Sequence, residues 1–400
     1  MSGALEGMKI LDMTQYEAGT SCTQYLGWLG AEIIKIESPF GDPGRSVQNH
    51  KQTTPGDSQY FMNYNSGKKS VILNLKTERG RQLFLDLVPK FDAFVENYGP
   101  DVLESFGIDT KQMQSINPKI IIARIKGFGL TGPNAAFNVF DPVAQAAGGA
   151  LSITGEPDGP PMPIGPTYAD TGTGVQVALG IVSAYVSALK TGMGQVIDAS
   201  MQECVTMFMR TADMPAWGTR PAQRRGTARG DIGGGMYRCK GGGTNDWLML
   251  FPGTDSMLDG LYTAIGRPEL AADDRFSTSV GLREHKAEFR EVIESWTLKH
   301  DKKEAMAILC EAGVPASYVY TTLDIFEDDH LAQRDFIHEV QHPINGTVKL
   351  MRAPLVMAGI EAPSRSPLLG EHSEEVLGEL LNISADDYST LFEEGITRPK

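Results

Sequence analysis

A single carboxylate, Asp170, lies among small residues in the segment PIGPTYADTGTG, which runs from Pro163 to Gly174. The apolar segment VQVALGIVSAYVSAL follows at once, so we expect Asp170 at the N-terminus of a helix that begins near Gly174. The free N–H groups and the dipole of a helix N-terminus favour the ionised form of a carboxylate. Such a group could act as a nucleophile beside backbone donors that bind an anion. Asp is also a favoured N-cap residue, so the spacing alone leaves a purely structural role open.

A glycine-rich segment, GDIGGGM at residues 230–236, could supply such donors or give access to the carboxylate, although its composition also fits a flexible linker. Motifs for other chemistries are missing. The turn TQYEAGT lacks the GxGxxG pattern of dinucleotide-binding proteins, so a solvated carboxylate explains Glu37 better than a ribose ligand does. The sequence also contains no Walker A motif and no GxSxG motif.

The composition argues against several classes of partner. The chain has 400 residues, of which 41% are hydrophobic and 22% charged, as in a soluble globular protein with more than one domain. The net charge is -14 and the sequence has no basic cluster, so we expect no nucleic-acid partner. The four scattered cysteines fit neither a disulfide framework nor a zinc site. His338 and His342 have helical spacing, but Pro343 argues against a helix, so no metal site is expected.

The cellular location follows from segments that are missing. The N-terminal sequence MSGALEGMKI has no features of a signal peptide. The apolar segment after Asp170 is judged too short and too interrupted to span a bilayer. We therefore expect a reduced, cytoplasmic protein without a membrane partner.

The order of elements predicts an α/β fold with a doubly wound parallel sheet. Helical patterns, including TERGRQLFLDLVPK with Thr77 as its cap, alternate with short apolar runs. The predicted strands are MKILDM (8–13), AEIIKIE (31–37), KSVILNL (69–75), FDAFVEN (91–97), KIIIARIKGFG (119–129) and GQVIDAS (194–200).

The alternation of strands and helices ends near residue 205, which predicts several domains. Residues 1–205 form the first part of a large domain. Residues 206–224 form a linker, and residues 225–315 form a smaller α+β domain with a hairpin around KGGGTND. Residues 316–400 form a second linker and the return to the large domain.

Many segments, in order along nearly the whole chain, resemble class III CoA-transferases of the formyl-CoA transferase type. The segments are LDMTQYEAGTSCTQYLGWLGAEIIKIE, SGKKSVILNLKT, VENYGPDVLESFGI, AQAAGGALSITGEPDGPPMPIG, ADTGTG, TGMGQVIDASMQE, AIGRPELAADDRFST and SPLLGEHSEEVL. The resemblance implies an interlocked homodimer whose large domain is built from both ends of each chain.

The same resemblance implies the reaction and its residues. Asp170 falls at the family's nucleophilic aspartate, which forms an anhydride with the acyl group of an acyl-CoA and then a thioester with CoA, before a small carboxylic acid accepts the CoA. Coenzyme A is therefore expected as part of a substrate and not as a tightly bound cofactor. The glycines implied to cover Asp170 are Gly233, Gly234 and Gly235. The positions implied to line or contact the CoA and acyl site are Gln15, Tyr16, Glu17, Ala18, Arg45, Lys76, Asn97, Tyr98 and Asp141.

Because the sequence departs from the family pattern in two places, the acyl group of the donor and the acceptor acid stay unidentified. Gln15 and Glu17 stand where formyl-CoA transferase has His and Gln, and an Arg expected after ENYGP is replaced near Ser105. Glu17 could be protonated, could pair with a cation, or could select the acceptor. We hypothesise that it disfavours oxalate. A solvent-exposed or helix-capping Glu17 is the structural alternative.

Three other functions fit the sequence less well. An α-methylacyl-CoA racemase would need a proton-transferring histidine where Phe140 precedes Asp141, and Phe exchanges no proton. A noncatalytic CoA-binding subunit would not be expected to keep both Asp170 and the glycine loop. A nucleotide-dependent oxidoreductase is disfavoured by the missing glycine pattern.

Overall fold

The computed structural model describes residues 2–47, 56–229 and 233–397, which form two compact units. The first unit comprises Met1–Ser152, Pro163–Arg220 and Arg334–Lys400. The second comprises Ile153–Met162 and Pro221–Gln333. Both ends of the chain therefore contribute to the first unit.

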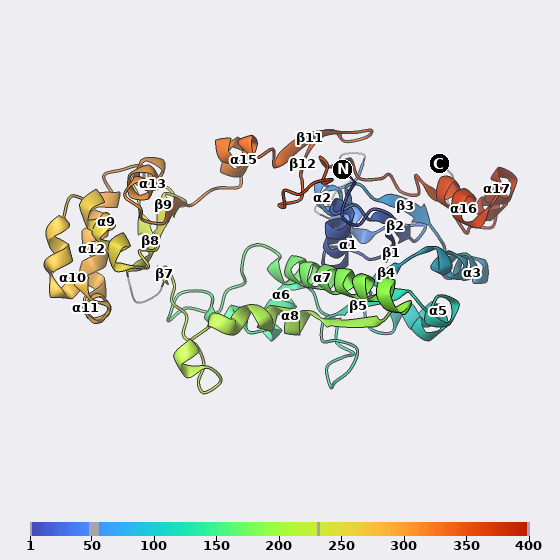
Figure 1. The fold of residues 1–400 in the computed structure, drawn as a ribbon, viewed down its shortest axis with the longest axis horizontal. Helices are drawn as coiled ribbons and strands as arrows, with labels where there is room; N and C mark the ends of the chain where they lie inside the picture. Colours follow the sequence, from blue (N-terminus) through green and yellow to red (C-terminus); the bar gives the residue numbers. More distant parts are fainter. Residues whose placement is uncertain (1, 48–55, 230–232, 398–400) are drawn as a thin grey trace. The chain divides into compact units, whose positions relative to one another are not determined.

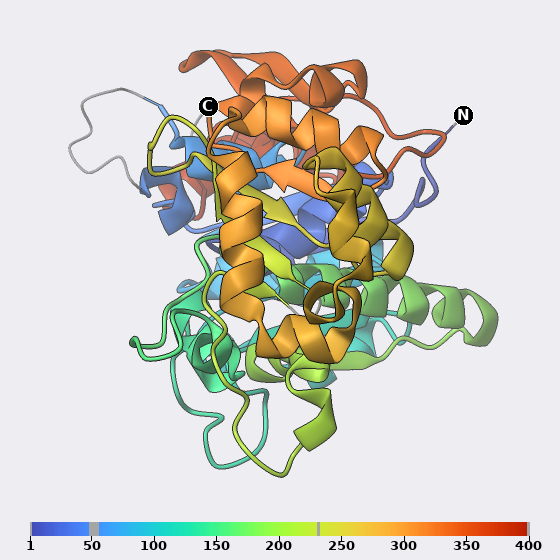
Figure 2. The same cartoon turned by 90° about the vertical axis from the view of Figure 1, so that its left-hand side faces the viewer.

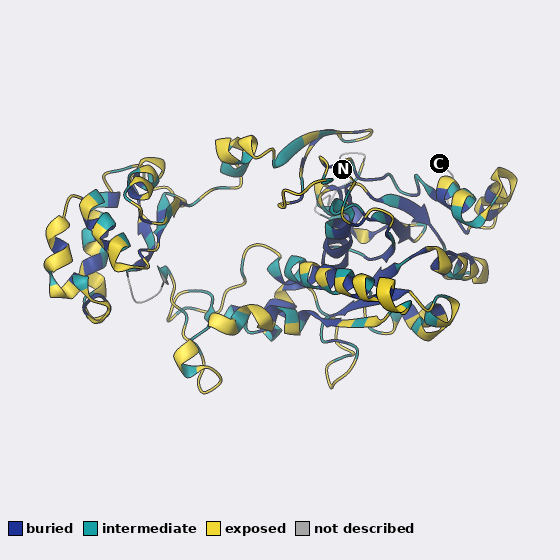
Figure 3. Cartoon of the chain, in the orientation of Figure 1, coloured by how far each residue is buried: buried dark blue, intermediate teal, exposed yellow. Residues whose placement is uncertain are grey.

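A six-stranded parallel sheet forms the centre of the first unit, in the order β3-β2-β1-β4-β5-β6 (Figure 1). Apolar residues occupy successive positions of the central strands because helices cover both faces of the sheet. These strands are accordingly buried along most of their length (Figure 3). The strands are β1 (Lys9–Met13), β2 (Glu32–Glu37), β3 (Lys69–Ile72), β4 (Ala93–Glu96), β5 (Ile121–Lys126) and β6 (Val196–Ser200). The predicted doubly wound sheet is confirmed.

Two apolar clusters lie on the two faces of this sheet. One joins the strands to α1 (Ala18–Trp28), α6 (Asp141–Ala147), α7 (Tyr168–Thr191) and α8 (Met201–Phe208). The other joins them to α3 (Glu78–Leu87), α4 (Val102–Ser105), α5 (Thr110–Ile116), α16 (Ser373–Leu381) and α17 (Ala385–Glu393). The unit also contains α2 (Gln59–Asn65) and an antiparallel pair of strands, β11 (Ile337–His342) and β12 (Gly346–Met351). The C-terminal helices thus complete one face of a sheet made by the first half of the chain.

Helices α1 and α7 pack closely because α7 carries a glycine at the contact. A Cβ atom on Gly174 would lie 2.2 Å from the Ser21 hydroxyl and 2.8 Å from the Ala18 carbonyl oxygen. No larger side chain fits there without a shift of one helix. At least one of the small residues after Asp170 is therefore required for packing.

Helix α7 is longer than the helix predicted from the sequence. It contains 24 residues, and among the described residues it is the helix that is long and apolar enough to cross a membrane by length and composition. The prediction that this segment is too short is wrong, because the helix begins at Tyr168 and not near Gly174. Core helices of soluble proteins meet the same criterion, and α7 packs along one side on α1 and the sheet.

The second unit is built on a four-stranded antiparallel sheet in the order β10-β9-β8-β7. Its strands are β7 (Ala228–Arg229), β8 (Gly234–Arg238), β9 (Trp247–Leu250) and β10 (Ala316–Tyr318), and β8 and β9 form the predicted hairpin. Helices α9 (Asp255–Ala264), α10 (Asp274–Ser277), α11 (Ser279–Glu284), α12 (Lys286–Thr297) and α13 (Lys302–Glu311) pack against these strands in one apolar cluster (Figure 2). Two short helices, α14 (Asp324–Glu327) and α15 (Asp329–Gln333), follow β10 and lie outside this cluster. Because β10 pairs with β9, this unit extends beyond the expected end at residue 315.

Candidate active site

Asp170 lies in the first turn of α7, and a side chain from a distant segment holds this turn. Asp141 Oδ2 accepts hydrogen bonds from the backbone N–H groups of Ala169 (2.8 Å) and Asp170 (3.1 Å). Gln145 Nε2 donates to the other oxygen of Asp141 at 2.6 Å and fixes its orientation. The N-cap residue, Thr167, makes no capping bond with its side chain. The alternative in which Asp170 is the cap is therefore wrong, and Asp141, predicted to contact CoA, serves as the cap instead.

A second carboxylate, Glu17, is bound to the same turn of α7. Its Oε1 atom accepts hydrogen bonds from the hydroxyls of Thr167 and Thr171, the latter at 2.7 Å. The side chain is buried, and it makes no capping bond at the start of α1. The structural alternative of an exposed or capping Glu17 is therefore wrong. Thr167 and Thr171 lie three residues before and one residue after Asp170, so Glu17 is fixed beside the candidate nucleophile.

Burial and two neighbouring carboxylates change the ionisation of Asp170. Desolvation, together with the smaller effects of the Glu17 and Asp141 charges, raises the pKa of Asp170 to about 8. Burial also raises the pKa of Glu17, although hydrogen bonds from Thr167 and Thr171 oppose this effect. The expectation that the helix N-terminus keeps Asp170 ionised is thus not met, because desolvation and like charges outweigh the helix dipole.

The raised pKa of Asp170 predicts how the reaction depends on pH. A carboxylate attacks only when it is ionised, so the reactive fraction is lost as the pH falls below about 8. We expect kcat/KM for the acyl-CoA to rise about tenfold per pH unit below this value and then to level off. Initial rates between about pH 5 and about pH 9 would measure the profile. A profile that is flat down to about pH 5 would contradict the assignment.

Four of the predicted site residues lie in the turn between β1 and α1 and at the first position of α1; they are Gln15, Tyr16, Glu17 and Ala18. The amide of Asn97, which follows β4, binds this turn at both backbone groups of Gln15. Gln15 N–H donates to Asn97 Oδ1 at 2.7 Å, and Asn97 Nδ2 donates to the Gln15 carbonyl at 2.8 Å. Tyr16 has a φ of 55°, a left-handed conformation that costs a non-glycine residue about 1–2 kcal/mol. The turn is therefore held by contacts from other segments.

These residues share one cavity of about 330 Å³ with Asp170. The cavity lies at the carboxyl ends of β1, β4 and β5, where ligands bind in open parallel sheets. The predicted site residues that line it are Gln15, Tyr16, Glu17, Ala18, Asn97, Tyr98 and Asp170. Ten further lining residues were not predicted as substrate contacts: Gly99, Pro100, Ile125, Lys126, Gly127, Phe137, Asn138, Val139, Phe140 and Met201. The available signal for Lys126 was a charged residue near the end of the predicted strand 119–129.

Lys126 is the cation of this lining, and its ammonium group is already engaged. It donates to Glu96 Oε2 at 2.8 Å and to the Tyr98 carbonyl at 2.6 Å. The aromatic part of the lining includes Tyr16 and Phe140, whose rings meet edge to face with centroids 5.9 Å apart. The cavity therefore combines buried carboxylates, a paired cation and apolar rings.

Other predicted residues lie elsewhere. The Arg45 guanidinium is buried, pairs with Glu37 (2.6 Å) and Asp57 (2.7 Å), and lies over the Phe61 ring. Arg45 does not line the cavity, and its donors are bound within the protein, so the geometry argues against the predicted contact with CoA phosphate. Glu37 is buried in this pair and is neither a solvated carboxylate nor placed as a ribose ligand.

Lys76 is exposed just before α3 and is not part of the cavity lining. Gly233, Gly234 and Gly235 belong to the second unit, where the last two begin β8. The rest of the predicted glycine loop, residues 230–232, lies outside the described residues. The predicted role of this loop at Asp170 stays a prediction. Among the residues that the structure describes, no group of three or more His, Cys, Asp or Glu side chains could hold a metal ion.

Comparisons with known proteins identify the family of this chain. The chain belongs to CoA-transferase family III, whose sequence model matches residues 5–373. It is 36% identical over 395 residues to a formyl-CoA:oxalate CoA-transferase of Streptomyces coelicolor, covering 94% of this chain and 95% of the relative. It is 35% identical to an enzyme of the same name from Bradyrhizobium sp., covering 100% and 98% of the two chains.

Solved structures show the same fold. A CAIB/BAIF family protein from Brucella suis has a TM-score of 0.84 and 31% identity, with 95% of this chain and 100% of that chain covered. The hypothetical protein Rv3272 from Mycobacterium tuberculosis has a TM-score of 0.80 and 26% identity, with 94% and 99% covered. The protein is thus a class III CoA-transferase similar to formyl-CoA transferase, and its family uses CoA thioesters as substrates.

Proposed function

We propose that this enzyme moves CoA from an acyl-CoA to a small carboxylic acid through covalent intermediates on Asp170. The observation that carries the proposal is the position of Asp170, which lines the cavity together with six of the implied substrate contacts, Gln15–Ala18 and Asn97–Tyr98. Lys126, the cavity cation, is bound to Glu96, so the carboxylate is left without a permanent counter-ion in the lining. A desolvated carboxylate without such a partner is a stronger nucleophile than one in water.

Each step exchanges one acyl bond for another. An oxygen of ionised Asp170 attacks the thioester carbon, the C–S bond breaks, and CoA thiolate leaves a mixed anhydride. The thiolate then attacks the Asp170 carbonyl, which releases the donor acid and leaves an aspartyl-CoA thioester. The acceptor carboxylate attacks this thioester to form a second anhydride and release CoA thiolate. The thiolate attacks the acceptor's acyl carbon, which gives the new acyl-CoA and restores Asp170 without net change in protons.

A matrix of acyl-CoA donors and carboxylate acceptors would test the proposed reaction. Mass analysis of the CoA products would identify which acids exchange. The proposal predicts a new acyl-CoA that requires both the donor and the acceptor. Hydrolysis of the donor alone, or epimerisation of a branched acyl-CoA without exchange, would contradict it. Phe140, which stands where a racemase would need histidine, packs on Tyr16 and transfers no proton.

The acceptor is proposed to be selected in part by Glu17. Its carboxylate is fixed by Thr167 and Thr171 beside Asp170, so the second carboxylate of bound oxalate would meet a like charge at low solvent exposure. We expect wild-type enzyme to use a monocarboxylate or a longer dicarboxylate better than oxalate. Glu17→Gln should raise the kcat/KM of oxalate relative to the preferred acid by about tenfold, which corresponds to about 1.4 kcal/mol.

The exposed Glu78 of α3 provides the matched control, because Glu78→Gln removes the same charge away from the cavity. This control variant should keep the wild-type order of acceptors. A wild-type preference for oxalate, or an order unchanged by Glu17→Gln, would contradict the role of Glu17.

We also propose that the chain works as an interlocked homodimer in the cytoplasm. The interlocking rests on the family resemblance, and the exposed face of α7 supports a protein contact. Val175, Leu179, Val186 and Leu189 are 44–69% exposed, and their spacing places them along one side of the helix. Large exposed apolar patches of this kind mark interaction surfaces. Sedimentation should show a dimer that does not dissociate on dilution, and a folded, active monomer would contradict this.

A further inference from the structure

The turn that carries Gln15, Tyr16 and Glu17 rests on a buried ion pair that the proposed reaction does not use. Lys35 belongs to β2, and Asp42 follows that strand. Lys35 Nζ lies 2.9 Å from Asp42 Oδ2, and their side chains are 0% and 1% exposed. Neither residue lines the cavity.

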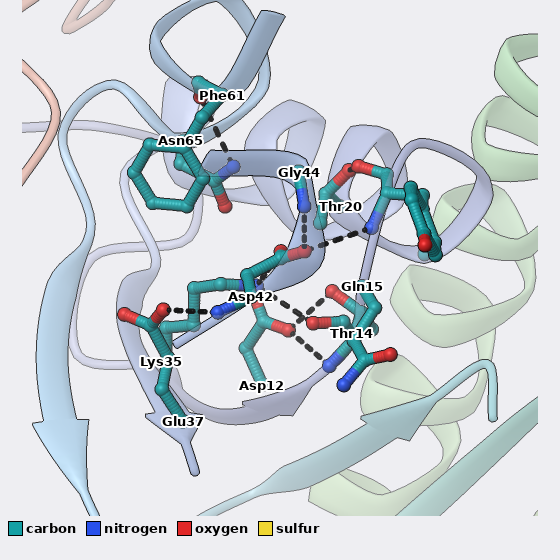
Figure 4. Close-up of polar contacts among 12 residues, drawn as sticks. Asp12, Thr14, Gln15, Thr20, Lys35, Glu37, Asp42, Gly44, Phe61 and Asn65 are labelled. Carbon is teal, nitrogen blue, oxygen red and sulfur yellow. Dashed lines mark hydrogen bonds and ion pairs between the residues drawn. The ribbon is translucent and has the colours of Figure 1, made fainter. Parts of the chain in front are cut away.

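Both side chains of this pair form hydrogen bonds with backbone atoms of the turn (Figure 4). Lys35 Nζ donates to the Thr14 carbonyl at 2.7 Å. Asp42 Oδ1 accepts from Tyr16 N–H at 3.2 Å and from Gly44 N–H at 2.8 Å. The pair therefore fixes the turn on both sides of Gln15, directly before Glu17.

The conformation of Tyr16 explains why the turn needs such support. Its φ of 55° is unfavourable for a residue with a side chain, and such a conformation persists only where surrounding contacts impose it. A buried ion pair is also a poor device for stability alone, because desolvation offsets much of the attraction between the charges. The hydrogen bonds of Lys35 and Asp42 to the turn instead specify its backbone conformation at Tyr16.

Given the proposed function, we infer that Lys35 and Asp42 are positioning residues that hold Tyr16 in its left-handed conformation and thereby fix Gln15 and Glu17 beside Asp170. They act through the turn and touch no substrate. Loss of the pair should leave the cavity open to acyl-CoA but misplace the groups around the nucleophile. The expected signature is a lower kcat with little change in KM.

The variant Asp42→Asn tests this role with a side chain of the same shape. The amide keeps one oxygen for Tyr16 N–H and Gly44 N–H but presents neutral N–H groups or a weaker acceptor to the Lys35 ammonium. We expect kcat to fall at least about tenfold while KM for the acyl-CoA changes less than about threefold. Lys35→Met should give the same pattern.

The matched control is Ile34→Ala, which truncates a buried neighbour of Lys35 in the same strand. Consecutive strand residues point to opposite faces, and Ile34 packs in the apolar cluster away from the turn. This variant should lose stability but keep a kcat within about twofold of wild type at a temperature where it is folded. Equal loss of kcat in both variants would show a merely structural role and overturn the inference.

Hydrogen exchange followed by mass spectrometry gives a readout that does not depend on activity. In Asp42→Ala, which removes the oxygen that accepts from the Tyr16 N–H, peptides that contain the Tyr16 amide should exchange at least about tenfold faster than in wild type, while peptides of β5 should be unchanged. A folded variant with wild-type kcat and wild-type exchange at Tyr16 would overturn the inference. Failure of the wild type to transfer CoA at all would instead refute the proposed function, and the exchange measurement would still decide the role of the pair.

Discussion

Replacing Asp170 with Asn or Ala is expected to abolish CoA transfer and to leave the fold intact. Neither side chain forms the anhydride or the thioester, so kcat/KM should fall by about 1000-fold or more. The fold should survive because the backbone N–H of Asp170, and not its side chain, donates the hydrogen bond to Asp141 that caps the helix. Exchange between a labelled donor acid and its acyl-CoA would measure the loss.

The control for this experiment is Asp86→Asn on α3, which removes an exposed carboxylate that does not line the cavity. It should retain wild-type exchange. Circular dichroism of each variant would verify the fold. Near-normal exchange by purified Asp170→Ala would exclude the aspartyl intermediates.

The second large effect is expected on stability when Lys68 is replaced by Met. The buried Lys68 ammonium contacts Asp12 Oδ2 (3.0 Å), the Thr20 carbonyl (3.0 Å), Thr23 Oγ1 (2.8 Å) and Asn65 Oδ1 (3.0 Å). Removing it leaves the fully buried Asp12 carboxylate without this partner. The free energy of unfolding should fall by about 3–5 kcal/mol. Urea denaturation at fixed protein concentration would measure the change.

The double variant Lys68→Met with Asp12→Asn separates the unpaired charge from the lost packing. Neutralising Asp12 should recover part of the stability, so the double variant should be more stable than the sum of the single effects predicts. A loss below about 1 kcal/mol in Lys68→Met would show that the pair contributes little. Additive single effects would show that the two charges do not depend on each other.

Much of the sheet could be predicted because its strands are short apolar runs. MKILDM, AEIIKIE and KIIIARIKGFG contain β1, β2 and β5, and the predicted cap Thr77 accepts a hydrogen bond from Gly80 at the start of α3. The start of α7 was misplaced for a physical reason. Its first turn is capped by Asp141, a residue 28 positions before Ala169, and local sequence carries no sign of this contact.

The correctly predicted part of the cavity lining consists mainly of residues that match the family pattern and also follow a strand. Gln15–Ala18 and Asn97–Tyr98 follow β1 and β4, and parallel neighbouring strands bring their ends together. Arg45 was misjudged because a surface phosphate ligand and a buried partner of Glu37 have the same residue type and spacing. The burial of Glu17 likewise depends on Thr167 and Thr171, which are 150 or more positions away.

The central claim is the covalent role of Asp170, and trapping the intermediate tests it most directly. Wild-type enzyme would be incubated with acyl-CoA and then with hydroxylamine or borohydride, and its peptides would be analysed by mass spectrometry. We expect modification at Asp170 that requires acyl-CoA, with Glu17 and Asp141 unmodified. Modification of another carboxylate, or none at Asp170 under conditions that support exchange, would contradict the account.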